Sequence, residues 1–234
     1  MNENLARVLP FVLVLGAGVA MLGNRTDSAL AASPSSVPAP VVDNKLAASP
    51  GTETAVFAGG CFWGIQAVYQ HVKGVKSSVS GYTGGRTTSP SYEEVSGGNT
   101  GHAEGVRVVF DPSKVSYGQL LRVLFAVAHD PTQLNRQGPD VGTQYRSEIF
   151  YTNPAQKRIA EAYIAQLDDA KIFKRPIVTK VSRLGAFTVA EDYHQNYANE
   201  HPNEPYIRFH DAPKVEALRK DFPEMYKTEL SAWK

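Results

Sequence analysis

The chain has 234 residues, of which 42% are hydrophobic and 20% are charged, and this composition is typical of a globular protein rather than a disordered or collagen-like one. Lysine and arginine number 24 against 23 aspartates and glutamates, so the formal net charge is +1 and no basic excess indicates nucleic-acid binding. The single cysteine, Cys61, excludes both an internal disulfide and a cysteine-rich metal site.

The N-terminal fifty residues have the pattern of a leader followed by a linker. Residues 8–22 form an apolar run that is shorter than the ~20 residues of a transmembrane helix, and the small residues at 29–32 fit a signal-peptide cleavage site. We therefore expect 1–32 to be a signal peptide, or an uncleaved anchor. The protein would then be exported, periplasmic or secreted, and tethered to the membrane if the leader stays. The Pro-, Ser- and Ala-rich residues 33–52 predict an extended linker with little to bury, ahead of a folded domain at 53–234.

Short apolar runs and apolar residues with a period of two predict five strands, each bounded by turn-forming residues. The first strand ends at Gly59 and Gly60, and the third is stopped by Asp111 and Pro112. The expected strands are 54–58, 77–83, 106–110, 148–151 and 177–181.

Four helices are expected between and after these strands, from apolar residues at helical spacing and from start signals. Two start signals are capping boxes, in which a Ser or Thr and a Glu or Gln three residues later bind free backbone N–H groups. The helices begin near Phe62, after Ser116 and Gln119, at Asn153 and Pro154, and after Thr188 and Glu191, the last one ending near Asn199. The order βαββαβ predicts an α/β (α+β) sandwich, in which helices cover a mixed split-βαβ, or ferredoxin-like, sheet. After Pro202 we expect only short helical pieces in a loop.

The motif GGCFWG at 59–64 contains the one cysteine. Two glycines between a strand and a helix let the chain turn sharply and leave Cys61 in the first helical turn. There the unpaired N–H groups and the helix dipole favour a thiolate, which is a nucleophile. A lone cysteine is also commonly a buried structural residue, so position alone leaves both interpretations open.

Four further stretches follow in order along the chain. They are GYTGG at 81–85 with PSYEEV at 90–95, GHAEG at 101–105, GPDVGTQYRS at 138–147 and AEDYHQ at 190–195. Together with GGCFWG, they resemble the peptide methionine sulfoxide reductase A family from about residue 55 to residue 197. The resemblance implies an α/β sandwich around a mixed sheet. It also implies a peptide-methionine (S)-S-oxide reductase, an oxidoreductase that reduces the S epimer of methionine sulfoxide, protein-bound or free, and so repairs oxidised proteins.

The same resemblance implies roles for individual residues. Cys61 would attack the sulfoxide sulfur, and Phe62 and Trp63 would form the apolar wall that holds the substrate methyl group. Glu104 would protonate the sulfoxide oxygen. A sulfoxide oxygen leaves poorly until it is protonated, so the reaction needs an acid. Glu104 meets that need at neutral pH only if burial raises its pKa.

Three polar residues complete the implied site. Tyr92 and Tyr145 would donate hydrogen bonds to the sulfoxide oxygen, and Asp140 would support the polar side of the pocket. A tyrosine hydroxyl can stabilise developing charge without carrying any. On the residues alone, these positions and Glu104 also fit ordinary roles: half-buried tyrosines, a turn-forming aspartate and a solvated glutamate. His194 is expected to be a structural hydrogen-bonding residue at the edge of the site.

The lone cysteine departs from many members of the family, which carry further cysteines toward the C-terminus. After one turnover Cys61 would be a sulfenic acid with no internal thiol to resolve it. We therefore expect no bound cofactor and no metal. The reductant would be external: a thioredoxin-like or glutaredoxin-like protein, or a small thiol. The expected partners are this thiol–disulfide reductant and oxidised proteins or peptides that carry methionine sulfoxide, with no nucleic acid and a monomeric enzyme.

Two other functions are open from the residues alone. Cys61 with a distant histidine would suit a thiol hydrolase, although the sequence around the cysteine lacks the papain-like signature. A secreted peptide-binding module would use the aromatic residues without any reactive thiol. Alkylation of Cys61 at mildly acidic pH would separate the binding module from an enzyme.

Overall fold

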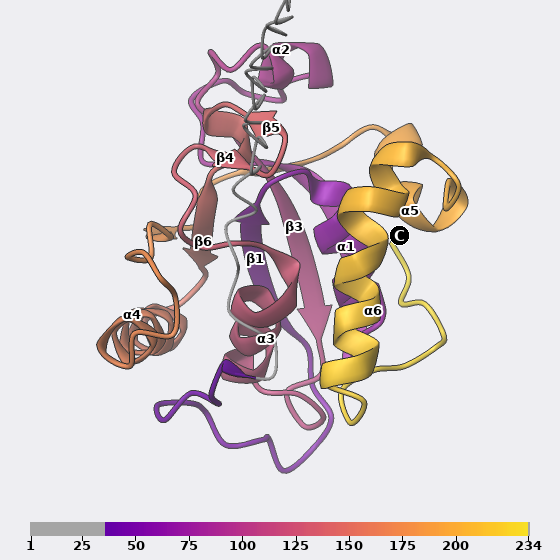
Figure 1. Cartoon of the computed structure of the whole chain (residues 1–234). Helices are drawn as coiled ribbons and strands as arrows, with labels where there is room; N and C mark the ends of the chain where they lie inside the picture. The colour runs from indigo at the N-terminus through magenta and orange to yellow at the C-terminus, as the bar shows by residue number, and fades with distance from the viewer. Residues whose placement is uncertain (1–35, 234) are drawn as a thin grey trace, which may run out of the picture. The chain divides into compact units, whose positions relative to one another are not determined.

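The structure is a computed structural model, and it describes residues 36–233 (Figure 1). The expected leader, residues 1–32, lies outside this range. Among the described residues, no helix is both long enough and apolar enough to cross a membrane.

A six-stranded sheet forms the centre of the described fold, with the strand order β7-β6-β1-β3-β2-β8. A separate hairpin of two short strands, β4 and β5, lies near the start of α1 (Figure 1). The strands are β1 (Glu53–Gly59), β2 (Val75–Thr83), β3 (Ala103–Phe110), β4 (Arg136–Gln137), β5 (Asp140–Val141), β6 (Ser147–Tyr151), β7 (Lys180–Arg183) and β8 (Phe187–Val189).

The pairing of these strands confirms the expected split-βαβ sheet. Strands β1 and β2 both pair antiparallel with β3, so they run parallel to each other with β3 between them. Likewise β1 separates β3 from β6, and the four strands have the ferredoxin-like order β6-β1-β3-β2. The parallel pairing of β6 with β7 makes the sheet mixed.

Helices cover the sheet, and α1 and α6 run side by side in Figure 1. The helix α4 packs near the other edge, on β6 and β7. The helices are α1 (Phe62–Gln70), α2 (Tyr92–Ser96), α3 (Tyr117–Val123), α4 (Pro154–Asp169), α5 (Tyr197–Glu200) and α6 (Ala212–Asp221). A wider π-helical turn, Leu124–Ala128, continues α3, and a second one, Ile207–Asp211, leads into α6.

The core follows from the alternation of side chains along the strands. Ala55 and Phe57 of β1 belong to the main cluster, where the Phe57 ring stacks on Tyr69 of α1 with ring centres 5.2 Å apart. Val56 and Ala58 point to the opposite face and join a smaller cluster. The sheet is therefore apolar on both faces, and its larger core lies under the helices.

Three of the four predicted helix starts are confirmed, and the first of them is α1 at Phe62. Ser116 and Gln119 form a complete capping box at α3, and the Asn153 side chain accepts a hydrogen bond from the Gln156 backbone N–H at the start of α4. The strand expected at 177–181 is displaced by a few residues, to β7.

The capping box predicted at Thr188 and Glu191 is wrong. Phe187–Val189 is instead the edge strand β8, in which Val189 is opposite Gly81 of β2. The Glu191 carboxylate is engaged by residues distant in sequence, and only short helical turns follow it. Pairing with the sheet thus outweighs the local Ser/Thr-x-x-Glu pattern.

The described part of the segment expected as an extended linker is attached to the folded domain, although it buries little. The Val37 side chain is fully buried, and the Val37 carbonyl accepts a hydrogen bond of 2.9 Å from Arg122 Nε. Tyr163 of α4 donates a bond of 2.6 Å to the Pro38 carbonyl, and Asp43 accepts one of 2.9 Å from the Gly118 N–H. This segment lies across α3 and α4. Its backbone carbonyls and the Asp43 carboxylate accept hydrogen bonds from donors on these two helices.

The segment after Pro202 is more regular than expected, since α6 has ten residues. Leu218 and Phe222 enter the main core, and two isolated bridges, at Val72 and Ser77, join the last residues to the rest of the fold. The C-terminal segment therefore covers α1 and reaches the start of that helix.

Candidate active site

Cys61 lies at the junction between β1 and α1, as the sequence predicted. Gly60 has a φ of +101°, a conformation that suits glycine, and a Cβ there would lie 2.6 Å from the Gln137 side chain. The turn therefore requires a glycine directly before the cysteine. Cys61 precedes the first turn of α1, is free, and is 8% exposed.

Glu104 shares this helix start with Cys61. It is the second residue of β3, is 2% exposed, and its Oε2 accepts a hydrogen bond of 3.0 Å from the Phe62 backbone N–H. Burial raises the pKa of Glu104 to about 8, although the Phe62 N–H opposes that rise. With this pKa, the buried carboxyl of Glu104 keeps its proton at neutral pH, as an acid beside Cys61 must.

The resting state of Cys61 differs from the expectation. Burial raises the pKa of its thiol well above the usual value, and the charges of Glu104 and Asp211 raise it further. A hydrogen bond from the Trp63 N–H and the charge of Lys214 lower the pKa by less. The thiolate that a helix N-terminus favours is therefore outweighed, because desolvation acts on the whole buried group. Cys61 rests as a thiol.

The two aromatic residues after Cys61 have different surroundings. Phe62 is buried, with its ring between Tyr82 and His194. Trp63 is half-buried and stacks on Tyr197, with ring centres 3.9 Å apart and an angle of 14° between the rings. Its indole N–H donates a bond of 3.2 Å to His194 Nδ1, which confirms the structural role expected of that histidine.

Tyr92 and Tyr145 lie within electrostatic reach of the same group of charges. The pKa of each phenol is raised by burial first and by the charge of Glu104 second, with smaller contributions from Cys61 and Asp140. Tyr92 is the first residue of α2, and Tyr145 ends a short helical turn just before β6. These contributions place both phenols in the same electrostatic environment as Cys61 and Glu104.

Glu191 connects Tyr92 to the central sheet. Its carboxylate accepts a bond of 2.8 Å from the Tyr82 hydroxyl and one of 2.9 Å from the Tyr92 backbone N–H. The two bonds connect α2 to β2, so the position of Tyr92 depends on a residue that the sequence had placed in a helix cap.

A cavity of about 190 Å³ opens beside Cys61. Asp140 lines it and accepts a hydrogen bond from the Tyr206 hydroxyl. Tyr206 and Lys214, which also line the cavity, come from the segment after Pro202 and were missed by sequence reasoning. No local motif marks them, and only the packing of the C-terminal segment on α1 brings them to the site. The full lining is Cys61, Gln137, Gly138, Pro139, Asp140, Tyr206, Phe209, His210 and Lys214.

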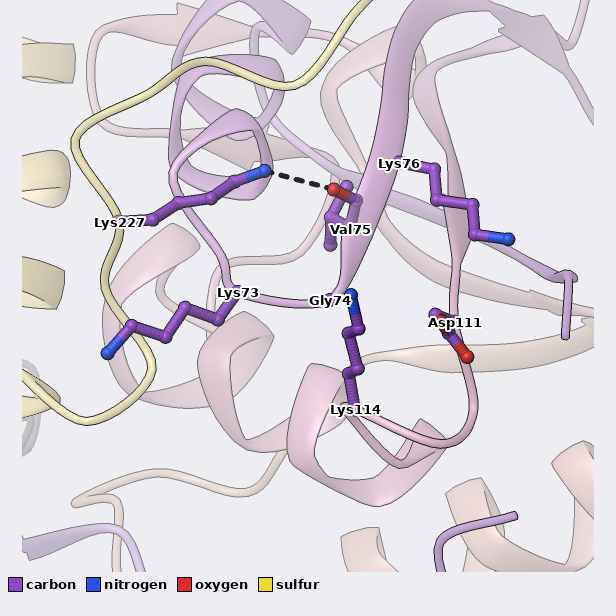
Figure 2. A pocket seen from close by; sticks show the side chains of 7 residues that line it. All are labelled: Lys73, Gly74, Val75, Lys76, Asp111, Lys114 and Lys227. Carbon is purple, nitrogen blue, oxygen red and sulfur yellow. Dashed lines mark hydrogen bonds between the residues drawn. The ribbon is translucent and has the colours of Figure 1, made fainter. Parts of the chain in front are cut away.

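A second hollow, of about 520 Å³, lies beyond the other end of α1 (Figure 2). Its ammonium groups are largely bound to backbone carbonyls, as in the bond of 3.0 Å from Lys227 to Val75. The lining is Lys73, Gly74, Val75, Lys76, Asp111, Lys114 and Lys227. It holds no nucleophile of the kind found at Cys61. Within residues 36–233, no group of three or more histidine, cysteine, aspartate or glutamate side chains is arranged to hold a metal ion.

The model of one protein family, described as peptide methionine sulfoxide reductase, matches residues 53–226. The chain belongs to this family. It is therefore an oxidoreductase that reduces methionine sulfoxide, and the family suggested by the sequence motifs is confirmed. Among curated relatives, peptide methionine sulfoxide reductase MsrA 2 of Mesorhizobium japonicum is 59% identical over 76% of this chain and 92% of the relative. MsrA 2 of Synechocystis is 49% identical over 82% and 91% of the two chains.

Two solved structures have the same fold. Methionine sulfoxide reductase A of Corynebacterium diphtheriae matches with a TM-score of 0.58 and 37% identity, over 72% of this chain and 85% of that one. Reduced Mxr1 of Saccharomyces cerevisiae matches with a TM-score of 0.57 and 28% identity, over 69% and 94%. The mixed α/β architecture expected from the sequence is thereby confirmed.

Proposed function

We propose that this reductase acts on the S epimer of methionine sulfoxide in peptides and proteins, by transfer of the sulfoxide oxygen to Cys61. The observation that carries the proposal is the shared helix start. A buried thiol and a buried carboxyl with a pKa of about 8 meet at the first N–H groups of α1, beside a cavity. The choice of the S epimer follows from the resemblance to the A-type family, to which the two curated relatives named above also belong.

The oxygen transfer balances with the groups at the site. The Cys61 thiol releases its proton to solvent, and the thiolate attacks the sulfoxide sulfur while Glu104 donates its proton to the oxygen. The attack forms a bond between Cys61 Sγ and the substrate sulfur. The protonated oxygen then passes from the substrate sulfur to Cys61 Sγ, so the S–O bond of the substrate and the new S–S bond break as an S–O bond forms on Cys61. The products are methionine, Cys61 sulfenic acid and the Glu104 carboxylate. Cys61 is oxidised by two electrons and the substrate is reduced by two. Solvent then returns a proton to Glu104.

The remaining site residues hold the substrate in this proposal. Tyr92 and Tyr145 donate hydrogen bonds to the sulfoxide oxygen as negative charge develops on it. Phe62 and Trp63 hold the terminal methyl group against apolar surface. Asp140 acts through the Tyr206 hydroxyl, which it fixes on the polar side of the cavity.

Recycling in this proposal requires a thiol from outside the chain, because Cys61 is the one cysteine in the sequence. An external thiol condenses with the sulfenic acid to give a mixed disulfide and water, and a second thiol releases Cys61 as a disulfide forms in the reductant. A thioredoxin-like or glutaredoxin-like protein supplies both thiols at once, whereas a small thiol acts twice. The enzyme works in an exported, periplasmic or secreted location if the N-terminal leader functions as its sequence suggests.

A single-turnover assay without added reductant tests this function. The reduced full chain is mixed with the S or the R epimer of a blocked methionine sulfoxide, and methionine, free thiol and trapped sulfenic acid are counted. We expect about one methionine per protein from the S epimer alone, with loss of the thiol and a sulfenic-acid adduct on Cys61. Product from the R epimer, or product with the thiol intact, would contradict the proposal.

A further inference from the structure

The C-terminal segment places a charge pair directly against the first turn of α1. Gly64 is in this turn, three residues after Cys61, and a Cβ at Gly64 would lie 2.1 Å from Asp211 Oδ1 and 2.8 Å from Lys214 Nζ. Lys214 also lines the cavity beside Cys61. The pair is therefore part of the wall of the site, although it comes from the far end of the chain.

Asp211 and Lys214 fix each other. Lys214 Nζ lies 3.0 Å from Asp211 Oδ1, and the Asp211 side chain is fully buried while that of Lys214 is 17% exposed. The other oxygen, Asp211 Oδ2, has no hydrogen-bond partner among residues 36–233. A buried carboxylate without a counter-charge is costly, so Asp211 holds the ammonium of Lys214 at this place instead of letting it extend into solvent.

The other ionisable groups near Cys61 come from several elements. Glu104 of β3 shares the start of α1, and Asp140 of β5, Tyr206 and His210 line the same cavity. The charge of Cys61 acts on the pKa values of Tyr92 and Tyr145, which come from α2 and from the turn before β6. Among the charges that act most on Cys61, Glu104 and Asp211 oppose ionisation of the thiol, and Lys214 favours it.

We propose that Lys214, held in place by Asp211, stabilises the negative charge that Cys61 carries when it attacks the sulfoxide. The inference rests on the proposed function, since it assigns a further residue to the same step. In that step the Cys61 sulfur supplies the electron pair and the acid supplies the proton, while the ammonium keeps its own protons and acts by charge alone. Asp211 is a positioning residue, because it acts on Cys61 through Lys214 and through its own opposing charge.

Lys214 and Asp211 have opposite effects on the ionisation of the Cys61 thiol. Variants of the two residues should therefore change the reactivity of the thiol in opposite directions, which a loss of structure would not do. The rate of alkylation of Cys61 by iodoacetamide is measured between pH 6 and pH 10 on the reduced full chain. Lys214→Met should slow alkylation about tenfold at a fixed pH below the midpoint, since a unit charge at close range inside a protein has an effect of this size. Asp211→Asn should speed it several-fold, because the amide oxygen can still accept the hydrogen bond that holds Lys214 while the charge that opposes ionisation of Cys61 is removed. Lys214→Arg should stay within about threefold of the wild type, because the charge remains.

Matched controls separate charge from packing. Lys220→Met makes the same change on α6 at an exposed position and should leave alkylation unchanged. Lys214→Gln keeps a hydrogen-bond donor for Asp211 and replaces Lys214→Met if that variant does not fold. Circular dichroism establishes the fold of each variant. A shift of Lys214→Met and Asp211→Asn in the same direction, or an unchanged rate in both neutral Lys214 variants, would overturn the inference.

The proposed function is tested separately in these samples, because alkylation needs no substrate. Failure of the wild type to reduce methionine sulfoxide would refute the function and remove the step that Lys214 serves. Normal turnover by the wild type, with equal alkylation in wild type and Lys214→Met, would refute the role of Lys214 alone. Single turnover by Lys214→Met should fall by the same factor as its alkylation.

Discussion

At the first turn of α1, Cys61, Glu104 and Asp211 are removed from water, whereas beyond its last turn Lys73 and Lys76 are exposed. The pKa values of these buried groups are all raised, and burial is the largest cause of each rise. The exposed ammonium groups bind backbone carbonyls, as Lys73 does with Glu224 over 3.0 Å. The comparison shows that burial, more than the mere presence of charged side chains around a hollow, shifts the pKa values at one end of the helix.

The largest effect is expected at the sulfur itself. Cys61→Ser should abolish reduction of methionine sulfoxide, because a hydroxyl oxygen cannot accept the sulfoxide oxygen and become a sulfenic acid. Methionine release in the single-turnover assay measures this. Any reduction left in the variant would show that Cys61 is not the group that takes up the oxygen, and that the buried end of α1 is not the reactive one.

A large loss is also expected at the acid. Glu104→Gln should slow the chemical step about a hundredfold or more, since general acid catalysis contributes this much.

The rate of the wild type should depend on pH through the same carboxyl. Cys61 has the higher pKa, so the first proton that the pair loses as the pH rises comes mainly from Glu104. The reacting state, a thiolate beside neutral Glu104, has also lost one proton, and its share of the enzyme therefore grows as this first proton leaves. The wild-type rate should rise up to about pH 8 and then level off.

The pH profile of Glu104→Gln provides the matching control. Its rate should continue to rise above pH 8, because only the Cys61 thiol then titrates. Single-turnover rates between pH 5 and pH 10 measure both curves. A bend near pH 8 that persists in the variant would assign that titration to another group.

A smaller effect is expected on stability, which should fall as the pH rises, whereas the reaction rate should rise. Burial raises the folded-state pKa of Glu104 from 4.5 to about 8, so the folded protein holds a proton that the unfolded chain releases. The free energy of unfolding should therefore fall as the pH rises from about 5 to 8, relative to that of Glu104→Gln, by a few kcal/mol in all. Urea unfolding at a series of pH values measures the difference, and a constant difference would show that Glu104 is not desolvated in solution.

The smallest effect is expected at the exposed hollow. Lys114→Met should change turnover less than about twofold and stability by less than about 0.5 kcal/mol, as is usual for exposed side chains. Steady-state kinetics with a small thiol as reductant measures the first, and urea unfolding measures the second. A marked loss of turnover would mean that the lysine-rich end of α1 takes part in the function after all.

Local patterns predicted the parts of the molecule that depend on local physics. The glycine pair before Cys61 and the capping box of Ser116 and Gln119 satisfy backbone requirements within a few residues, and the structure has both. The similar pattern at Thr188 and Glu191 failed, because pairing with the sheet and two distant donors engage these residues instead.

The electrostatics of the site could not be predicted in the same way. The dipole of α1 is a local property, and it led to an expected thiolate at Cys61. Desolvation depends on everything that covers the sulfur, including a segment 150 residues further along the chain that contains Asp211 and Lys214. That segment has no motif, so the sequence gives no sign that it reaches the site. Val37 is a similar case, because its burial depends on α3 and α4.

The missing side chain at Gly64 has a consequence for how this enzyme can vary. Asp211 and the end of Lys214 occupy the space where a Cβ would be, so the absence of a side chain at Gly64 allows the C-terminal segment to pack closely on α1. A methyl group there would overlap Asp211 Oδ1 and Lys214 Nζ, so these side chains would have to move. The size of the residue next to the cysteine motif is therefore limited by two side chains from the far end of the chain.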